Sequence, residues 1–149
     1  MFRFLKNFDT LESDEVLLRL SEKHRGNAEL LPFYYYDIYR KDTDVPIGKI
    51  SLRIGENAHS DYNGHIGYEI DTPHRGNHFS YFACLALLPL ARAHGMTHLL
   101  LSCAESNAAS RRIVEKLGAE LLEIVPIPKS CFFWREGIED YCIYRLNLS

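Results

Sequence analysis

The first half of the chain alternates hydrophobic and polar positions with a period of two, which predicts β-strands. Residues 33–40 are almost all aromatic or β-branched, and within residues 47–55 the apolar Ile50, Leu52 and Ile54 alternate with the polar Lys49, Ser51 and Arg53. A polar turn joins these two stretches, so we expect an antiparallel hairpin with one buried face. Residues 64–71 continue the pattern as a further strand. Residues 15–23 are expected as a strand too, although their Glu, Leu, Lys and Arg also suit a helix.

The pattern changes after residue 78. Residues 79–94 are rich in helix formers and apolar on nearly every side, which predicts a helix in the interior. Pro89 lies within this helix and should kink it near Leu85. Residues 97–103 form a short apolar strand. A strand–helix–strand order implies that this strand runs parallel to strand 64–71.

The last third predicts an amphipathic helix at 107–117 and two strands at 120–125 and 141–148. An irregular, aromatic-rich loop lies between these strands. Residues 1–14 show no clear period and are left unassigned. The whole chain, residues 1–149, is therefore expected to form one domain of the α/β (α+β) class.

A polar decapeptide, Asp71 to Ser80, connects strand 64–71 to the interior helix. Pro73 should end the strand, and Gly76 allows a tight turn into the helix. Such a junction directs backbone N–H groups and the positive end of a helix dipole to one point, which suits a phosphate. Arg75 and the neighbouring histidines add donors. On these residues alone, a plain connector is an equal alternative.

Composition limits the classes of function. The chain has 149 residues, 46% of them apolar, and a net charge of −3 with scattered basic residues, so we expect no nucleic-acid partner. The four cysteines lack CxxC spacing and predict buried free thiols in a reducing compartment rather than disulfides or a metal site. The N-terminus lacks an apolar signal region and no apolar run could span a bilayer, so a cytoplasmic location without membrane attachment is expected.

The junction resembles a known family. Its six residues are Arg75, Gly76, Asn77, His78, Phe79 and Ser80. They resemble the Arg/Gln-x-x-Gly-x-Gly/Ala pyrophosphate loop of the GNAT superfamily of N-acetyltransferases. The match departs at His78, where a glycine is expected, and at Ser80, where Gly or Ala is expected.

A second stretch supports the resemblance. Residues 107–119 (NAASRRIVEKLGA) resemble the Asn-x-x-Ser-x-x-x-x-Glu-Lys-x-Gly signature of the branch that includes ribosomal-protein N-terminal acetyltransferases. It follows the loop at the expected distance. The resemblance implies a three-layer GNAT-like fold, in which helices flank a mixed, mostly antiparallel central sheet.

The resemblance also implies an activity. A member would move an acetyl group from acetyl-coenzyme A, without a metal, to a primary amine of a small molecule or of a peptide or protein N-terminus, by direct attack. The expected partners are this acceptor and, as one possibility, a second copy of the chain. The implied cofactor-binding residues are Tyr68, Ile70, Arg75, Gly76, Asn77, His78, Phe79, Ser80, Asn107 and Ser110.

The implied catalytic groups are His65, Glu69 and Ser110. The family often takes the proton for the leaving thiolate from a tyrosine in the second helix, where this chain has Val114. Ser110, Tyr141, Tyr144 and solvent are the alternatives. His65 stands where the family places its base, eight residues before Pro73.

A structural role for His65 is equally open, and Glu69 is the reserve candidate for the base. Two alternatives to an enzyme also remain. The chain could be a non-catalytic coenzyme A-binding module or sensor of the same fold, or a scaffold that does not bind coenzyme A.

Overall fold

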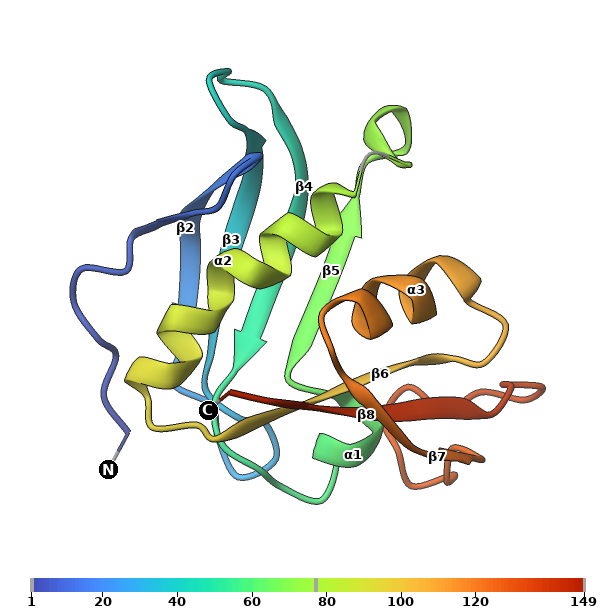
Figure 1. Cartoon of the computed structure of the whole chain (residues 1–149). Coiled ribbons are helices and arrows are strands. Elements are labelled where there is room, and N and C mark those ends of the chain that lie inside the picture. The colour runs from blue at the N-terminus through green and yellow to red at the C-terminus, as the bar shows by residue number, and fades with distance from the viewer. Residues whose placement is uncertain (1, 77, 149) are drawn as a thin grey trace.

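The computed structural model describes residues 2–76 and 78–148, which form two antiparallel sheets flanked by helices (Figure 1). The strands are β1 (Thr10–Glu12), β2 (Val16–His24), β3 (Phe33–Arg40), β4 (Pro46–Arg53), β5 (Ile66–Ile70), β6 (His98–Ala104), β7 (Glu120–Val125) and β8 (Tyr141–Asn147). The helices are α1 (Ser60–Asn63), α2 (Phe79–Ala93) and α3 (Ala108–Lys116), with a short 3-10 turn at Thr72–His74. The expected α/β class with mostly antiparallel sheets is confirmed.

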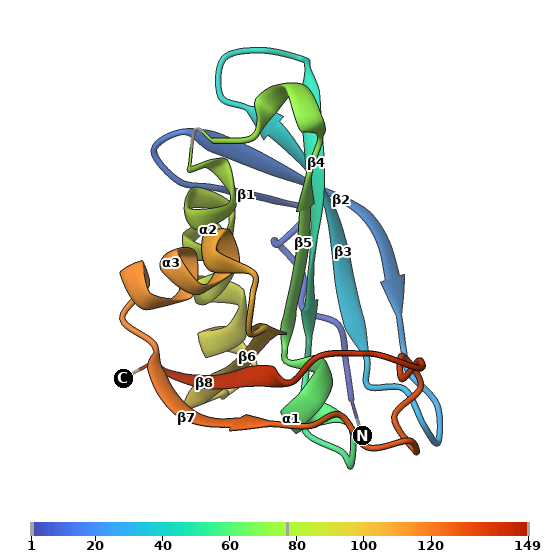
Figure 2. The same cartoon turned by 90° about the vertical axis from the view of Figure 1, so that its right-hand side faces the viewer.

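The larger sheet is a meander in the order β1-β2-β3-β4-β5, and every described pairing in it is antiparallel. Its alternation turns one side of each strand toward α2, which packs across β2, β4 and β5 (Figure 2). Fully buried side chains of this core include Leu18, Tyr36, Ile38, Leu52 and Leu87. The predicted hairpin of residues 33–55 and the strand at 15–23 are confirmed.

The smaller sheet has the order β6-β8-β7, and its strands run across those of the larger sheet (Figure 1). β8 lies in the middle and pairs antiparallel with both neighbours, so the two strands predicted at 120–125 and 141–148 are confirmed as a pair. The predicted parallel pair of β5 and β6 is wrong, because within the described residues no ladder joins them. Their chains touch near residue 65 and then diverge.

Two short elements of the structure were not predicted from the sequence. β1 has three residues, too few to show a period, and α1 is one helical turn within a stretch of turn-forming residues. α2 continues through Pro89, and a kink near Leu85 stays a prediction. All four cysteines are buried free thiols, as expected. No helix in the described ranges is long and apolar enough to cross a membrane.

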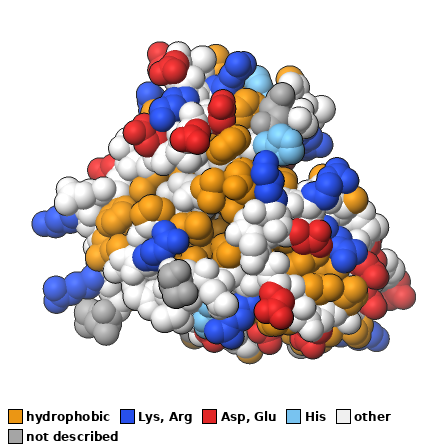
Figure 3. All heavy atoms as spheres, viewed as in Figure 1, with side chains coloured by type: hydrophobic (Ala, Val, Ile, Leu, Met, Phe, Trp, Pro, Cys, Tyr) orange, Lys and Arg blue, Asp and Glu red, His pale blue; other side chains and the backbone are white. Residues whose placement is uncertain are grey.

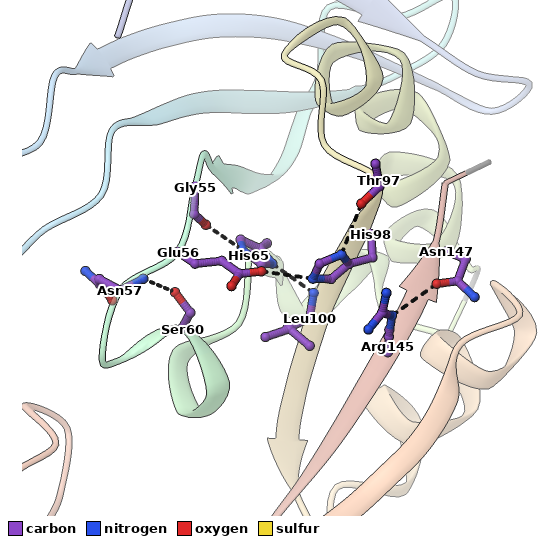
Figure 4. Close-up of polar contacts among 10 residues, drawn as sticks. All are labelled: Gly55, Glu56, Asn57, Ser60, His65, Thr97, His98, Leu100, Arg145 and Asn147. Carbon is purple, nitrogen blue, oxygen red and sulfur yellow. Dashed lines mark hydrogen bonds and ion pairs between the residues drawn. The ribbon is translucent and has the colours of Figure 1, made fainter. Parts of the chain in front are cut away.

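The contact between the two sheets centres on the imidazole of His65, which is completely buried (Figure 4). The backbone N–H of Leu100 in β6 donates to Nδ1 over 2.8 Å, so the ring proton must be on Nε2. Nε2 then donates to the carbonyl oxygen of Gly55 over 2.7 Å. The backbone N–H of His65 donates in turn to the Leu100 carbonyl, over 2.7 Å. One residue thus fastens β6 to the start of β5 and to the end of β4.

Gly64 allows this close approach. A Cβ atom added there would lie 3.1 Å from the Leu100 carbonyl oxygen and 3.2 Å from the Ser102 nitrogen, and φ is +70°. A side chain at this position would push β6 away. The glycine and the histidine therefore act together where the sheets meet.

We expect His65→Ala to lower the free energy of unfolding by roughly 2–5 kcal/mol. The change leaves the Leu100 N–H and the Gly55 carbonyl without their partner and opens a cavity. Urea unfolding of the purified protein measures the loss. The matched control is His24→Ala, an exposed histidine on β2, which should stay within about 1 kcal/mol.

The pH dependence of stability gives a second readout of the same residue. Burial lowers the pKa of His65 below its ordinary 6.5, so the unfolded chain takes up this proton first as the pH falls. The stability that the neutral ring provides is complete above about pH 6.5 and is lost toward the lower pKa of the folded state. The free energy of unfolding of the unsubstituted protein should therefore fall more between pH 7.5 and pH 5.5 than that of the His65→Gln variant. Equal losses would contradict the neutral, buried ring.

Candidate functional site

A groove of about 760 Å³ lies between β5, the start of α2 and α3. Its lining residues are Tyr68, Glu69, Ile70, His74, Arg75, Gly76, His78, Phe79, Ser80, Asn107, Ala109, Ser110, Arg112, Ile113, Glu115 and Lys116. The groove brings together all the described residues that the resemblance implies for cofactor binding. Asn77, the remaining one, lies outside the described residues.

The loop before α2 has two residues in the left-handed backbone region. Gly76 has φ +85°, and no atom lies within 4 Å of a Cβ added there, so the glycine is required for its backbone angle and not for space. His78 is the N-cap of α2 with φ 61°, a conformation that favours glycine. This angle gives a physical reason for the glycine that the family pattern places at His78.

The groove is positively charged around the N-terminal end of α2. Histidine, lysine and arginine side chains gather there and over α3 on the face shown in Figure 3. Arg75 Nε donates to the Ile70 carbonyl oxygen over 2.8 Å and so fixes the loop against the end of β5. Lys116 Nζ lies 4.3 Å from the ring centre of Tyr81, which links α3 to α2. This end of the groove suits an anion.

The other end of the groove holds a pair of hydroxyl groups. Tyr68 Oη from β5 and Ser110 Oγ from α3 share a hydrogen bond of 2.8 Å. Burial raises the pKa of Tyr68 to about 12, so its hydroxyl is protonated at neutral pH. Asn107 Oδ1 accepts from the Ser110 backbone N–H over 3.2 Å and caps α3. The sequence indicated Tyr68 and Ser110 separately. The hydrogen bond between them could not be predicted, because 42 residues separate the two in the chain.

A second cavity, of about 410 Å³, continues past this pair and shares Tyr68, Asn107 and Ser110 with the groove. Its lining is mostly aromatic and apolar, and Arg53 is its one charged residue among those described. A third cavity, of about 240 Å³, shares Arg53, Asn63 and Phe132 with the second. Because neighbouring cavities share lining residues, the three follow one another along a path from the charged loop to the segment before β3 and the end of β4.

The expected catalytic residues lie in different environments. His65 lines none of the three cavities, and hydrogen bonds occupy both ring nitrogens, so no lone pair is free to accept a proton. This geometry argues for its structural role and against its role as the base. Glu69 is exposed on β5, opposite Lys49 of β4, and lines the groove.

The candidate proton donors Ser110, Tyr141 and Tyr144 also lie in different places. Ser110 and Tyr141 line the second cavity. Tyr144 lines none of the three and donates its hydroxyl proton to Glu115 over 2.8 Å. Among the residues that the structure describes, no group of three or more His, Cys, Asp and Glu side chains could hold a metal ion.

Comparisons with known proteins agree with this geometry. A family model described as an acetyltransferase (GNAT) domain matches residues 3–120. A protein of Vibrio cholerae classed as a ribosomal-protein-serine acetyltransferase is 14% identical, with a TM-score of 0.65 over 93% of this chain and 97% of that one. No curated protein matches the chain.

Two proteins of Salmonella typhimurium have the same fold. An acetyltransferase that modifies the N-terminal serine of ribosomal protein L7/L12 is 19% identical, with a TM-score of 0.60 over 78% of this chain and 64% of that one. A protein classed as an acetyltransferase, solved with acetyl-coenzyme A, is 18% identical, with a TM-score of 0.60 over 78% of this chain and 65% of that one. The chain thus spans just under two thirds of each Salmonella protein. Since the family model covers most of its length, the chain belongs to the GNAT acetyltransferase family.

Proposed function

We propose that the protein transfers an acetyl group from acetyl-coenzyme A directly to a primary amine. The observation that carries this proposal is the groove, which joins a positively charged loop at one end to the Tyr68–Ser110 pair at the other. The residues fit coenzyme A: the volume of about 760 Å³ suits an elongated ligand, and the basic lining suits its phosphates. The primary amine would belong to a small molecule or to the N-terminus of a peptide or protein.

The charged loop would hold the pyrophosphate, through the backbone N–H groups of residues 75–80 and through the side chains of Arg112 and Lys116. The free edge of β5 would hold the pantetheine arm. β5 pairs with β4 on one side, and no described strand ladder covers its other side. An extended chain can add to such an edge through its amide groups, as a strand would.

The proton steps would use residues on both sides of β5. The amine nitrogen bonds to the thioester carbon, the carbon–sulfur bond breaks, and the amine loses a proton through water to Glu69. Ser110, oriented by Tyr68, would donate a proton to the departing sulfur and would regain one from water. Glu69 thereby takes the role that was expected for His65, because its carboxylate is exposed in the groove and the His65 ring is occupied.

Two buried thiols favour direct transfer over an acetylated enzyme. Cys84 and Cys103 line the second cavity. Burial raises the pKa of Cys84 to about 12 and that of Cys103 to about 11. Since the thiolate is the nucleophilic form, neither side chain would compete with the amine at neutral pH.

The second candidate is a coenzyme A-binding module without turnover, favoured by Val114 at the position of the usual tyrosine. Release of free thiol from acetyl-coenzyme A with a panel of amines decides between the two: amine-dependent release supports the enzyme, and binding without release supports the module. We further propose that residues 1–149 act as one domain in the cytoplasm, since buried free thiols fit a reducing compartment. A homodimer stays a prediction.

The loop assignment predicts that Gly76→Val weakens coenzyme A binding at least tenfold, because a β-branched residue cannot readily adopt φ +85°. Saturating coenzyme A should stabilise the native protein by roughly 2–4 kcal/mol in thermal unfolding, and pantetheine without phosphates far less. The matched control is Gly95→Val, since Gly95 has φ +78° and open space but lies after α2, outside the groove. Equal affinity of the two variants for coenzyme A would mean that the loop is only a connector between β5 and α2.

The hydroxyl pair predicts a loss of turnover with little change in binding. We expect Ser110→Ala to lower kcat by roughly 10–10³-fold, because the sulfur would then leave without its donor. Tyr68→Phe keeps the ring and should lower kcat less. Coenzyme A affinity by calorimetry should change little, and Ser106→Ala, an exposed serine outside the cavities, is the control. Full activity in both Ser110→Ala and Tyr68→Phe would mean that solvent, and not this pair, supplies the proton to the departing sulfur.

The base assignment predicts that Glu69→Gln lowers kcat by roughly 10²–10⁴-fold and changes coenzyme A affinity by calorimetry little. Asp71→Asn is the matched control, because it removes the next carboxylate along the chain on the same side of the strand. A kcat that is equal in Glu69→Gln and in Asp71→Asn would exclude Glu69 as the base.

A further inference from the structure

Arg53 lies where the second and third cavities meet and is held there by backbone groups. Its guanidinium Nη1 donates to the carbonyl oxygens of Gly64 over 3.1 Å and of Asn63 over 3.3 Å. Its own backbone N–H donates to the His65 carbonyl over 2.7 Å. The side chain is therefore fixed by the same segment that joins the two sheets.

Arg53 takes part in none of the described ion pairs, and the carboxylate that lines a cavity with it is Glu29, in the third cavity. The described ion pairs are Arg19–Asp44, Lys41–Glu12 and His98–Glu56. Arg53 is half-buried, and burial lowers its pKa, although an arginine stays charged at neutral pH. Partly burying a cation costs free energy unless an anion accompanies it. A fixed guanidinium of this kind suits a carboxylate, which it can bind through two parallel hydrogen bonds.

Gly67 places this charge beside the reacting groups. A Cβ atom added at Gly67 would lie 3.4 Å from Arg53 Nη2, so the guanidinium lies over the strand residue that precedes Tyr68. Glu69 follows on the same side of β5, about 7 Å along the strand, since side chains two residues apart share a face. A cation of β4 and an anion of β5 thus lie on the same face of the larger sheet.

We infer that the acceptor carries a carboxylate close to its amine, as an α-amino acid does, and that Arg53 binds this carboxylate. The inference rests on the proposed function and names the acceptor class for that site. The carboxylate would lie on Arg53, and the amine would point toward Glu69 and the thioester. A polyamine would not suit the second cavity, whose one described charge is positive.

The rest of the path indicates the side chain of this acceptor. Phe132 lines both the second and the third cavity and is 64% exposed, although it is a large apolar residue. Its ring meets Phe133 edge-on with centroids 5.4 Å apart, and Tyr62 and Tyr141 also line the second cavity. An aromatic or aliphatic side chain of the acceptor would cover Phe132 from water. An apolar amino acid therefore fits better than a peptide N-terminus, which has no carboxylate next to its amine.

Three compounds of one shape test this inference: phenylalanine, phenylalaninamide and phenylethylamine. Calorimetry with the protein–coenzyme A complex should show that phenylalanine binds roughly 10–100-fold more tightly than the amide, the range expected for a charged hydrogen-bonded pair. Initial rates of thiol release should give the same order in kcat/KM. Arg53→Gln should reduce the affinity for phenylalanine to that for the amide. Arg145 is an exposed arginine of β8 outside the cavities, so the Arg145→Gln variant should keep the preference for phenylalanine.

Each outcome has one meaning. Equal binding of the three compounds, or an unchanged preference in Arg53→Gln, overturns the inference and leaves the proposed acetyl transfer intact. Selective binding of phenylalanine without thiol release from any amine supports the carboxylate site and overturns the transfer. If Arg53→Gln fails to bind coenzyme A and so reports misfolding, Arg53→Lys keeps the charge but not the paired hydrogen bonds. That variant should then lose most of the preference while it still binds coenzyme A.

Discussion

The structure depends on the hydrogen bonds of one buried imidazole. The His65 ring accepts a hydrogen bond from the Leu100 N–H of β6 and donates one to the carbonyl oxygen of Gly55, just after β4. The backbone N–H of His65 donates a further hydrogen bond to the Leu100 carbonyl. These bonds join the two sheets at one point. Beyond that point β5 and β6 separate, since no described ladder links them, and residues of both strands line the second cavity. A continuous sheet would leave no free edge for a ligand.

The alternation of β5 divides the site into two sides. Tyr68 points toward α3, where it bonds to Ser110, and Gly67 and Glu69 face the opposite side. Arg53 from the neighbouring strand lies over Gly67 on that opposite side. Both sides of this short strand border the site, since Tyr68 and Glu69 line the groove proposed for coenzyme A, and Gly67 and Tyr68 line the second cavity, proposed for the acceptor.

Local signals predicted the parts of the fold that local physics determines. The hairpin of β3 and β4 follows from alternation, and α3 follows from its apolar face and its Asn107 cap. The loop at residues 75–80 was found because glycine and the start of a helix are visible in the sequence. The separation of the sheets, the partners of the His65 ring and the position of Arg53 were not predicted, because each depends on contacts between segments far apart in the chain. Spacing and the family resemblance left a catalytic and a structural role for His65 equally open, and the partners of both ring nitrogens argue for the structural one.

The edges of the sheets also decide how the protein resists aggregation. An exposed edge strand offers unpaired backbone groups to other molecules. In the larger sheet one edge, β1, has only three residues, and the other, β5, lies inside a groove behind α2 and α3. The smaller sheet is less protected, because Leu121, Leu122 and Ile124 of its edge strand β7 are 41%, 51% and 39% exposed. Unwanted association between copies would therefore begin at β7, far from the charged loop, and Glu120 and Glu123 are the charges that oppose it.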